Sequence, residues 1–177
     1  IWSRLVGSEM CIRDRPDPVQ LEYHLPNKIN LSVDKNYSDF ISKLIDRFPH
    51  ERRGITKFYG ACRKVFNCLD SMPLLSIEDP SYLFKVFMKA PLSCLGLARW
   101  LPINVGDVAR KFIKDPELLK FIDIECFCWS VMPALKTPMI NAGMVFTDRH
   151  VGGINYPKGG VGTIAEKLVK GLEKLGS

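Results

Sequence analysis

The chain has 177 residues, of which 46% are hydrophobic and 25% are charged, and its formal net charge is +6. This composition is that of a globular protein with an apolar core, and no stretch approaches the roughly 18 uninterrupted apolar residues of a membrane-spanning helix. The positive excess is spread along the chain. It therefore argues against a dedicated nucleic-acid surface but would suit contact with an anionic membrane.

The first fifteen residues stand apart from the rest. Residues 5–15 look like a sequencing adapter translated in frame, since the string MCIRDR can be written back as the end of a transposon used to fragment DNA. The chain also opens on Ile1 rather than Met. We therefore expect residues 1–15 to be an adapter-derived artefact and set them aside, as one would an expression scar. A genuine amino-terminal segment is the alternative. On the first interpretation, the chain is a piece of a longer protein.

A β-hairpin is the first predicted element. Val19–Leu25 and Ile29–Val33 alternate apolar and polar residues, and residues 26–28 between them have the composition of a turn. Alternation of this kind predicts two paired strands with one buried face.

Helical spacing follows the hairpin. A first helix is predicted to be capped by Asp34 or Asn36 and to end at Pro49. A second helix is predicted from about Glu51 to Met72, with its apolar residues on one stripe.

A third helix should begin near Asp79, and it opens a segment of unusual composition. Between Tyr82 and Leu101 most residues are apolar, the only charges are cationic, and Pro91 breaks the segment in two. A short, aromatic-rich, cationic and acid-free segment is typical of a helix that lies in a bilayer interface. Burial against the rest of the protein would explain the same residues.

Two further helices are predicted, a short one at about residues 105–114 and a longer one from Asp115 and Pro116. The longer helix is apolar nearly all round, which is typical of a buried helix. Glu125 falls on its apolar side. A carboxylate there must be paired with a cation, or it must be neutral with a raised pKa, as a general acid would be. The sequence leaves both alternatives open.

The cysteines are expected to be reduced, buried and small hydrophobic residues rather than ligands. Those outside the first fifteen residues are Cys62, Cys68, Cys94, Cys126 and Cys128. A metal site built from the last two with one histidine is the alternative (His24, His50 or His150), but the spacing does not match the usual tetrahedral zinc frameworks. We therefore predict no metal.

A glycine-rich turn precedes the last predicted helix. Gly159 and Gly160 would let the backbone approach a flat or phosphorylated ligand, Pro157 stiffens the entry, and Tyr156 supplies an aromatic face. Apolar residues then recur at helical spacing over residues 161–175. Such a turn is either simple structural punctuation or a cofactor cradle.

Several stretches, taken together, resemble the carotenoid cis–trans isomerases of plants and cyanobacteria, which belong to the FAD-dependent carotenoid desaturase and isomerase superfamily. They are FPHE (48–51), IKDPELL (113–119), FIDIEC (121–126), TPMINA (137–142), and DRH with GGINYP (148–157). The resemblance runs from about Pro16 to Ser177. The Tyr-Pro-x-Gly-Gly motif is shared with carotene desaturases and retinol saturases, and Val151 stands where the family leads us to expect an aromatic residue.

The resemblance implies an α+β, mostly helical piece of a two-domain FAD-oxidoreductase fold whose dinucleotide-binding half is missing from this chain. Residues 16–151 would form the substrate-binding or cap region, and residues 152–177 would re-enter the FAD domain. The glycine-rich turn, with Tyr156, Pro157, Gly159 and Gly160, would pass close to the flavin. Glu125 would serve in acid–base chemistry or tunnel polarity.

The resemblance also implies conversion of poly-cis-lycopene to all-trans-lycopene by reduced FAD without net redox change, with NAD or NADP left open as an electron source. The expected partners are lycopene isomers and a plastid or cyanobacterial membrane, bound peripherally, without nucleic acid. The isolated piece is expected to be inactive. A redox relative (a retinol saturase or carotene desaturase) and a non-catalytic apolar-ligand or membrane-binding module are the alternatives.

Overall fold

The computed structural model describes residues 14–16, 19–25, 29–72 and 80–174. The predicted turn at residues 26–28 and the predicted cap at Asp79 lie outside these ranges. The described helices are α2 (Tyr37–Arg47), α3 (Arg52–Asp70), α4 (Pro80–Lys89), α5 (Pro91–Trp100), α6 (Val105–Phe112), α7 (Pro116–Ser130), α8 (Met139–Val151) and α9 (Gly162–Lys174). The described strands are β1 (Asp14–Pro16), β2 (Val19–Leu25), β3 (Ile29–Asp34) and β4 (Asn155–Pro157). The chain is thus mostly helical, as the sequence predicts.

The predicted hairpin is confirmed. Strands β2 and β3 pair antiparallel, with Tyr23 opposite Leu31. Tyr23, Leu31 and Val33 are buried and form the inner face of the hairpin. The Tyr23 ring packs edge-on against Phe121 of α7, with 5.2 Å between ring centroids, so the hairpin covers one side of the helical core.

The helices of the first half begin and end close to the predicted residues. Asn36 rather than Asp34 caps α2, because its side chain accepts a hydrogen bond from the Ser38 N–H at 2.9 Å. Helix α3 buries the predicted apolar stripe, including Phe58 and Cys62. The predicted short helix is present as α6, and α7 begins at Pro116.

Helix α8 was not predicted from the sequence, although it lies at the centre of the molecule. Its N-cap position is Pro138, which makes no side-chain cap hydrogen bond, so the usual start signal is absent. Helix α8 packs extensively against α3. A Cβ atom added at Gly143 would lie 2.6 Å from the Cβ of Val65, so the two helices cross closely at this glycine.

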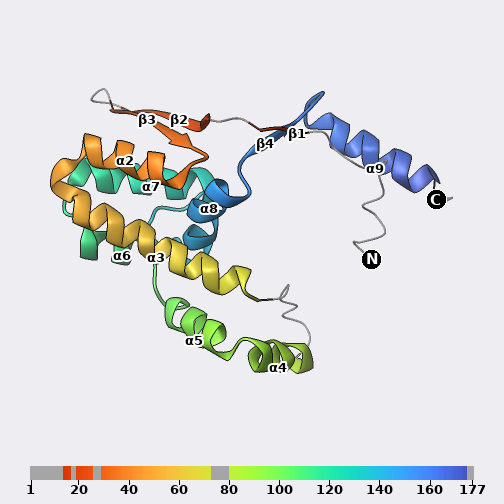
Figure 1. Cartoon of the computed structure of the whole chain (residues 1–177), viewed down its shortest axis with the longest axis horizontal. Coiled ribbons are helices and arrows are strands. Elements are labelled where there is room, and N and C mark those ends of the chain that lie inside the picture. The colour runs from red at the N-terminus through yellow and green to blue at the C-terminus, as the bar shows by residue number, and fades with distance from the viewer. Residues whose placement is uncertain (1–13, 17–18, 26–28, 73–79, 175–177) are drawn as a thin grey trace.

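Two parts of the chain lie at the margin of this core. Helices α4 and α5 form one edge of the molecule, and α9 projects from the other side beyond the small β1–β4 pair (Figure 1). Strand β1 places Asp14 and Arg15, which belong to the segment set aside above, opposite Pro157 and Tyr156. Within the described ranges, no helix combines the length and apolarity needed to cross a bilayer.

Candidate functional site

Glu125 lies on α7 in the centre of the core and is 0% exposed. The Arg149 Nη1 group of α8 donates to its Oε1 atom at 2.6 Å, and the Tyr59 hydroxyl of α3 donates to its Oε2 atom at 2.9 Å. Both carboxylate oxygens therefore have partners. Of the two alternatives that the sequence left open for Glu125, the structure shows the ion pair.

Arg149 is as deeply buried as its partner, with 3% of the residue exposed. Burial is the largest effect on the pKa of Arg149 and acts to lower it, but the charge and hydrogen bond of Glu125, together with the nearby tyrosines, outweigh burial and raise the pKa, so the guanidinium stays charged. The guanidinium carbon lies 4.8 Å from the ring centroid of Phe40 and 5.3 Å from that of Phe146. These contacts place the cation between aromatic faces. Its Nη2 atom has no hydrogen-bond partner among the described residues.

Tyr59 completes the cluster from α3. Burial raises the pKa of its hydroxyl well above the usual value, and the charge of Glu125 adds to this effect. The hydroxyl therefore remains protonated and can act only as a donor to the carboxylate. Edge-to-face contacts with Phe40 and Phe58, at centroid distances of 5.3 and 5.1 Å, fix the position of the ring.

His150 extends the cluster toward the hairpin. Its Nδ1 atom lies 2.9 Å from the carbonyl oxygen of Asp34, and the Arg149 Nε–H donates to its Nε2 atom at 3.3 Å. A carbonyl accepts at one nitrogen and a guanidinium donates at the other, so these neighbours select the neutral ring with its proton on Nδ1. Burial first, and then the charge of Arg149, lower the pKa of His150 to about 4.

The arrangement of Glu125 and Arg149 joins α7 and α8 through a neutralised pair of buried charges. A reacting molecule could contact the Glu125 carboxylate only after the packing around it had opened, because the residue is fully buried. Neither Arg149 nor Tyr59 was identified from the sequence as a partner. The burial of Glu125 predicts a cationic partner. Arg149 lies 24 residues away along the chain, so no local pattern in the sequence identifies it as that partner.

A second polar cluster joins two of the motifs quoted above, FPHE and IKDPELL. Glu51 is 7% exposed, and its Oε1 atom accepts from the backbone N–H groups of Lys114 and Asp115 at 2.5 and 2.6 Å. The His50 Nε2 atom is hydrogen-bonded to the Asp115 Oδ2 atom at 2.7 Å. Burial acts to raise the pKa of Asp115, but the hydrogen bonds from Leu118, His50 and the backbone of Glu117 outweigh it and lower the pKa. These residues satisfy backbone groups where α7 begins, which is a structural role.

The glycine-rich turn has the backbone conformation that requires glycine. The φ angles of Gly159 and Gly160 are +92° and +88°, which side-chain-bearing residues rarely adopt. A Cβ atom added at Gly159 would lie 2.7 Å from the Cγ2 atom of Thr163. The Gly160 N–H donates to the Pro157 carbonyl, and the Thr163 N–H donates to the Gly160 carbonyl. Pro157 is buried, whereas the side chain of Tyr156 lies outside what the structure describes.

The predicted site residues fall into two separate places. Glu125 lies in the core, whereas the glycine-rich turn lies on the projecting part of the chain that leads into α9 (Figure 1). The structure thus brings Tyr156, Pro157, Gly159 and Gly160 together by chain continuity and does not bring Glu125 to them.

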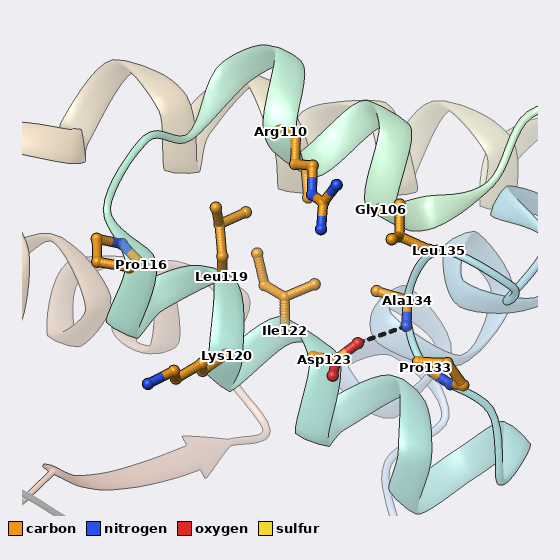
Figure 2. A pocket seen from close by; sticks show the side chains of 11 residues that line it. Gly106, Arg110, Pro116, Leu119, Lys120, Ile122, Asp123, Pro133, Ala134 and Leu135 are labelled. Carbon is orange, nitrogen blue, oxygen red and sulfur yellow. Dashed lines mark hydrogen bonds between the residues drawn. The ribbon is translucent and has the colours of Figure 1, made fainter.

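A surface cleft of about 300 Å³ lies elsewhere, between α6, α7 and the loop at residues 133–135 (Figure 2). Leu119 and Ile122 supply apolar lining, Arg110 points toward the cleft, and Asp123 is held by a 2.7 Å hydrogen bond from the Ala134 N–H. None of the predicted site residues lines this cleft. Its volume is at the lower end of those of small-molecule pockets.

All five cysteines outside the first fifteen residues are free. Cys62 and Cys126 are buried as predicted, and burial, followed by the charge of Glu125, raises the pKa of Cys126 to about 12. Cys128 is exposed, so the prediction of burial is wrong there, because its position on α7 points away from the core. Among the described residues, no group of three or more Cys, His, Asp or Glu side chains could hold a metal ion.

Comparison with known proteins identifies relatives by sequence only. No family model matches the chain, and no solved structure gives a significant match. Prolycopene isomerase of Daucus carota is 59% identical over 162 residues, which is 92% of this chain and 26% of the relative. Prolycopene isomerase 1 of the Oncidium hybrid cultivar is 55% identical over 177 residues, or 100% of this chain and 30% of the relative. Prolycopene isomerase of Arabidopsis thaliana is 56% identical over 174 residues, or 98% and 29%.

All three relatives are described as chloroplastic. The chain spans less than a third of their length, and the match extends over nearly all of the chain in each case. By sequence, the chain is therefore a homologue of the chloroplastic prolycopene isomerases, over a segment of less than a third of their length.

Proposed function

We propose that the protein containing this chain converts poly-cis-lycopene to all-trans-lycopene in plastids, as a cis–trans isomerase of carotenoid biosynthesis. Support comes from one observation, which is the identity of 55–59% to proteins named prolycopene isomerase over 92–100% of the chain. The reaction converts cis double bonds to trans and leaves the hydrogen count of the polyene unchanged.

FAD is the proposed cofactor. Reduced flavin would supply reversible electron or hydrogen exchange, which lowers the bond order of a conjugated double bond and permits rotation. The glycine-rich turn fits a place beside such a flat group, since Gly159 and Gly160 carry no Cβ and are not fully buried. Pro157 and Tyr156 would flank the same approach. The names of the relatives give no support for NAD or NADP as an electron source.

The turn would contribute close main-chain approach, and two of its N–H groups are not free to bind a cofactor. The Gly160 and Thr163 N–H groups already bond within the turn. The remaining contacts to the cofactor would come from residues outside this chain. Replacing Gly160 with valine would not test flavin binding. A φ of +88° disfavours valine whether or not a flavin is present.

Glu125 remains the residue of this segment that we predict to act in acid–base chemistry. Its carboxylate is held by Arg149 and Tyr59, so a direct proton transfer to the polyene would require the ion pair to open. In the closed pair, Glu125 would instead position α7 and α8 beside the substrate. A pH profile of turnover separates the two roles, because only the first adds the Glu125 ionisation to the profile.

The substrate class supports contact with a membrane. A long polyene is insoluble in water and resides in membranes, so an enzyme that acts on it must offer apolar surface and reach a bilayer. We therefore include peripheral attachment to a plastid membrane in the proposed function.

A segment exchange tests the proposal. Residues 16–177 would replace the corresponding segment of the Daucus carota relative, and a matched exchange with the Arabidopsis thaliana segment would control for the junctions. We expect the exchanged, flavin-loaded protein to convert poly-cis-lycopene to an all-trans product of unchanged mass. A product that has lost or gained hydrogen would favour the desaturase or saturase alternatives. A folded, flavin-loaded exchange that leaves the substrate unchanged, beside an active control, would overturn the proposal.

A further inference from the structure

Helices α4 and α5 expose large apolar side chains to solvent. Phe84 and Met88 of α4 are 66% and 64% exposed, and Leu92 and Leu95 of α5 are 84% and 60% exposed. Large apolar side chains scattered singly on a surface need no explanation, but adjacent ones on consecutive helices form a patch. We call these four residues the α4–α5 face.

The side chains of this face share one side of each helix. At 100° per residue, Phe84 and Met88 lie about 40° apart, and the buried Val86 lies roughly opposite them. On α5, Leu92 and Leu95 lie about 60° apart, on the side away from the buried Leu97. Each helix thus turns one apolar side toward the protein and a second apolar side outward.

The described protein does not cover the outward sides. Among the described elements, α4 makes its main contacts with α5, and α5 makes its main contacts with α3. Figure 1 shows the two helices along one edge of the molecule, away from the hairpin. The alternative that the sequence left open, burial of the whole segment against the core, applies to the inward residues only.

The charged residues within α4 and α5 are all cationic. No Asp or Glu occurs between residues 80 and 106, whereas Lys85, Lys89 and Arg99 do. All three cations are exposed, and within the described ranges none has a carboxylate at ion-pair distance. Lys85 and Lys89 lie between the outward and the inward side of α4, where long side chains can extend past an apolar surface to a charged layer.

Helix α9 provides an internal contrast. It also exposes apolar residues, since Leu168 and Leu172 are 47% and 52% exposed. It carries three exposed lysines (Lys167, Lys170 and Lys174) but also two exposed acids, Glu166 and Glu173, whereas the charges of α4 and α5 are cationic only. An anionic surface would repel these carboxylates but would attract the cations of α4 and α5.

We propose that the α4–α5 face docks on the surface of an anionic lipid bilayer. Phe84, Met88, Leu92 and Leu95 enter the boundary between headgroups and acyl chains, and the three cations contact anionic headgroups. The proposal adds a membrane-binding surface to the proposed function. It rests on that function in one respect, namely that the enzyme must reach a membrane. The exposure and charge of the face stand independently of any reaction.

Flotation with liposomes tests the docking. The 177-residue chain would be mixed with vesicles of phosphatidylglycerol and phosphatidylcholine in equal parts, and with vesicles of phosphatidylcholine alone. Phe84→Glu combined with Leu92→Glu alters the face, and Leu168→Glu combined with Leu172→Glu on α9 is the matched control. Aggregated protein sediments, so it is not confused with bound protein.

We expect the unaltered chain and the α9 variant to float with the anionic vesicles, with less flotation at high salt. The α4–α5 variant should lose at least about tenfold in partitioning, because two carboxylates replace two inserted apolar groups. Equal flotation of the two variants would overturn the proposal. A second outcome would also overturn it: the chain forms a dimer without lipid, the α4–α5 substitutions dissociate that dimer, and flotation is unchanged.

The same α4–α5 substitutions in the segment exchange distinguish failure of this inference from failure of the proposed function. With poly-cis-lycopene supplied in detergent, the variant should isomerise it at the rate of the unsubstituted exchange. Loss of activity in detergent would place the face in the substrate path and not on a membrane, and would overturn the docking.

Discussion

Two regions of the molecule differ in where they place residues of unexpected polarity. The core around α3, α7 and α8 buries charged side chains, whereas the edge formed by α4 and α5 exposes apolar ones. The core buries two charged side chains, Glu125 and Arg149, and pairs them at 2.6 Å. The edge exposes large apolar side chains such as Phe84 and leaves its cations unpaired within the described ranges. A buried charge must find its partner inside the chain, because desolvation is costly. An exposed apolar patch can find its partner outside. Out-of-place residues therefore indicate internal structure in one region and a docking surface in the other.

The largest expected effect is the loss of one partner from the core pair. Arg149→Met should lower the free energy of unfolding by about 3–5 kcal/mol, because Glu125 is left charged and buried without compensation. Urea denaturation of the 177-residue chain measures it. Adding Glu125→Leu to Arg149→Met should recover part of the loss, since no unpaired charge then remains. A single substitution within about 1 kcal/mol of the unaltered chain would contradict the importance of the pair.

Removal of the second hydrogen bond to Glu125 should cost less. Tyr59→Phe keeps the packed ring and deletes only the donor to a charged acceptor, so we expect a loss of about 1.5–3 kcal/mol in the same denaturation experiment. Tyr37→Phe is the matched control. The Tyr37 hydroxyl makes no hydrogen bond to the described residues, and this substitution should stay within about 0.5 kcal/mol. Equal losses for the two variants would mean that the bond to Glu125 adds nothing.

His150 should make the core sensitive to acid. Its pKa is about 4 in the folded protein and near 6.5 in the unfolded chain, so the unfolded state binds more protons between these values. Stability should therefore decrease as the pH falls from about 6.5 to about 4. The loss is on the order of 1–2 kcal/mol after allowance for the partial exposure of the ring.

Unfolding measured across this pH range, with His150→Asn as the comparison, checks the sign. Asn can still donate to the Asp34 carbonyl but does not titrate, so its slope with pH should be smaller. An unchanged slope would assign the acid sensitivity to another group.

The smallest effect is expected at the edge. Phe84→Ala should change the free energy of unfolding by no more than about 0.5 kcal/mol, because its ring is already 66% exposed. The same substitution at a buried phenylalanine, Phe58→Ala, should lower the free energy of unfolding by about 3–5 kcal/mol because it leaves a cavity in the core. Thermal or urea unfolding of the two variants gives the comparison. A large loss for Phe84→Ala would mean that the edge helps to hold the fold and is not a free surface.

Local patterns predicted most of the elements. Alternation located the hairpin, a period of 3.6 residues located α2, α3, α6, α7 and α9 to within a few residues, and polar caps marked the starts of α2 and α7. Helix α8 was missed because its N-cap position is a proline and its buried side includes Gly143, Thr147 and Arg149, so no run of large apolar residues marks the stripe. Composition indicated the unusual character of the segment from Tyr82 to Leu101, but not which of its sides faces outward.

The candidate site also has features that local sequence determined and features that only the tertiary structure determined. The sequence by itself determined that Glu125 is buried and that Gly159 and Gly160 open onto a helix, because side-chain period and glycine content are local properties. Only the tertiary structure decided that Arg149 neutralises Glu125 and that no described residue covers the outward apolar sides of α4 and α5. Pairing of buried charges and covering of apolar surface depend on which distant segments meet in space, and no local spacing along the chain encodes that meeting.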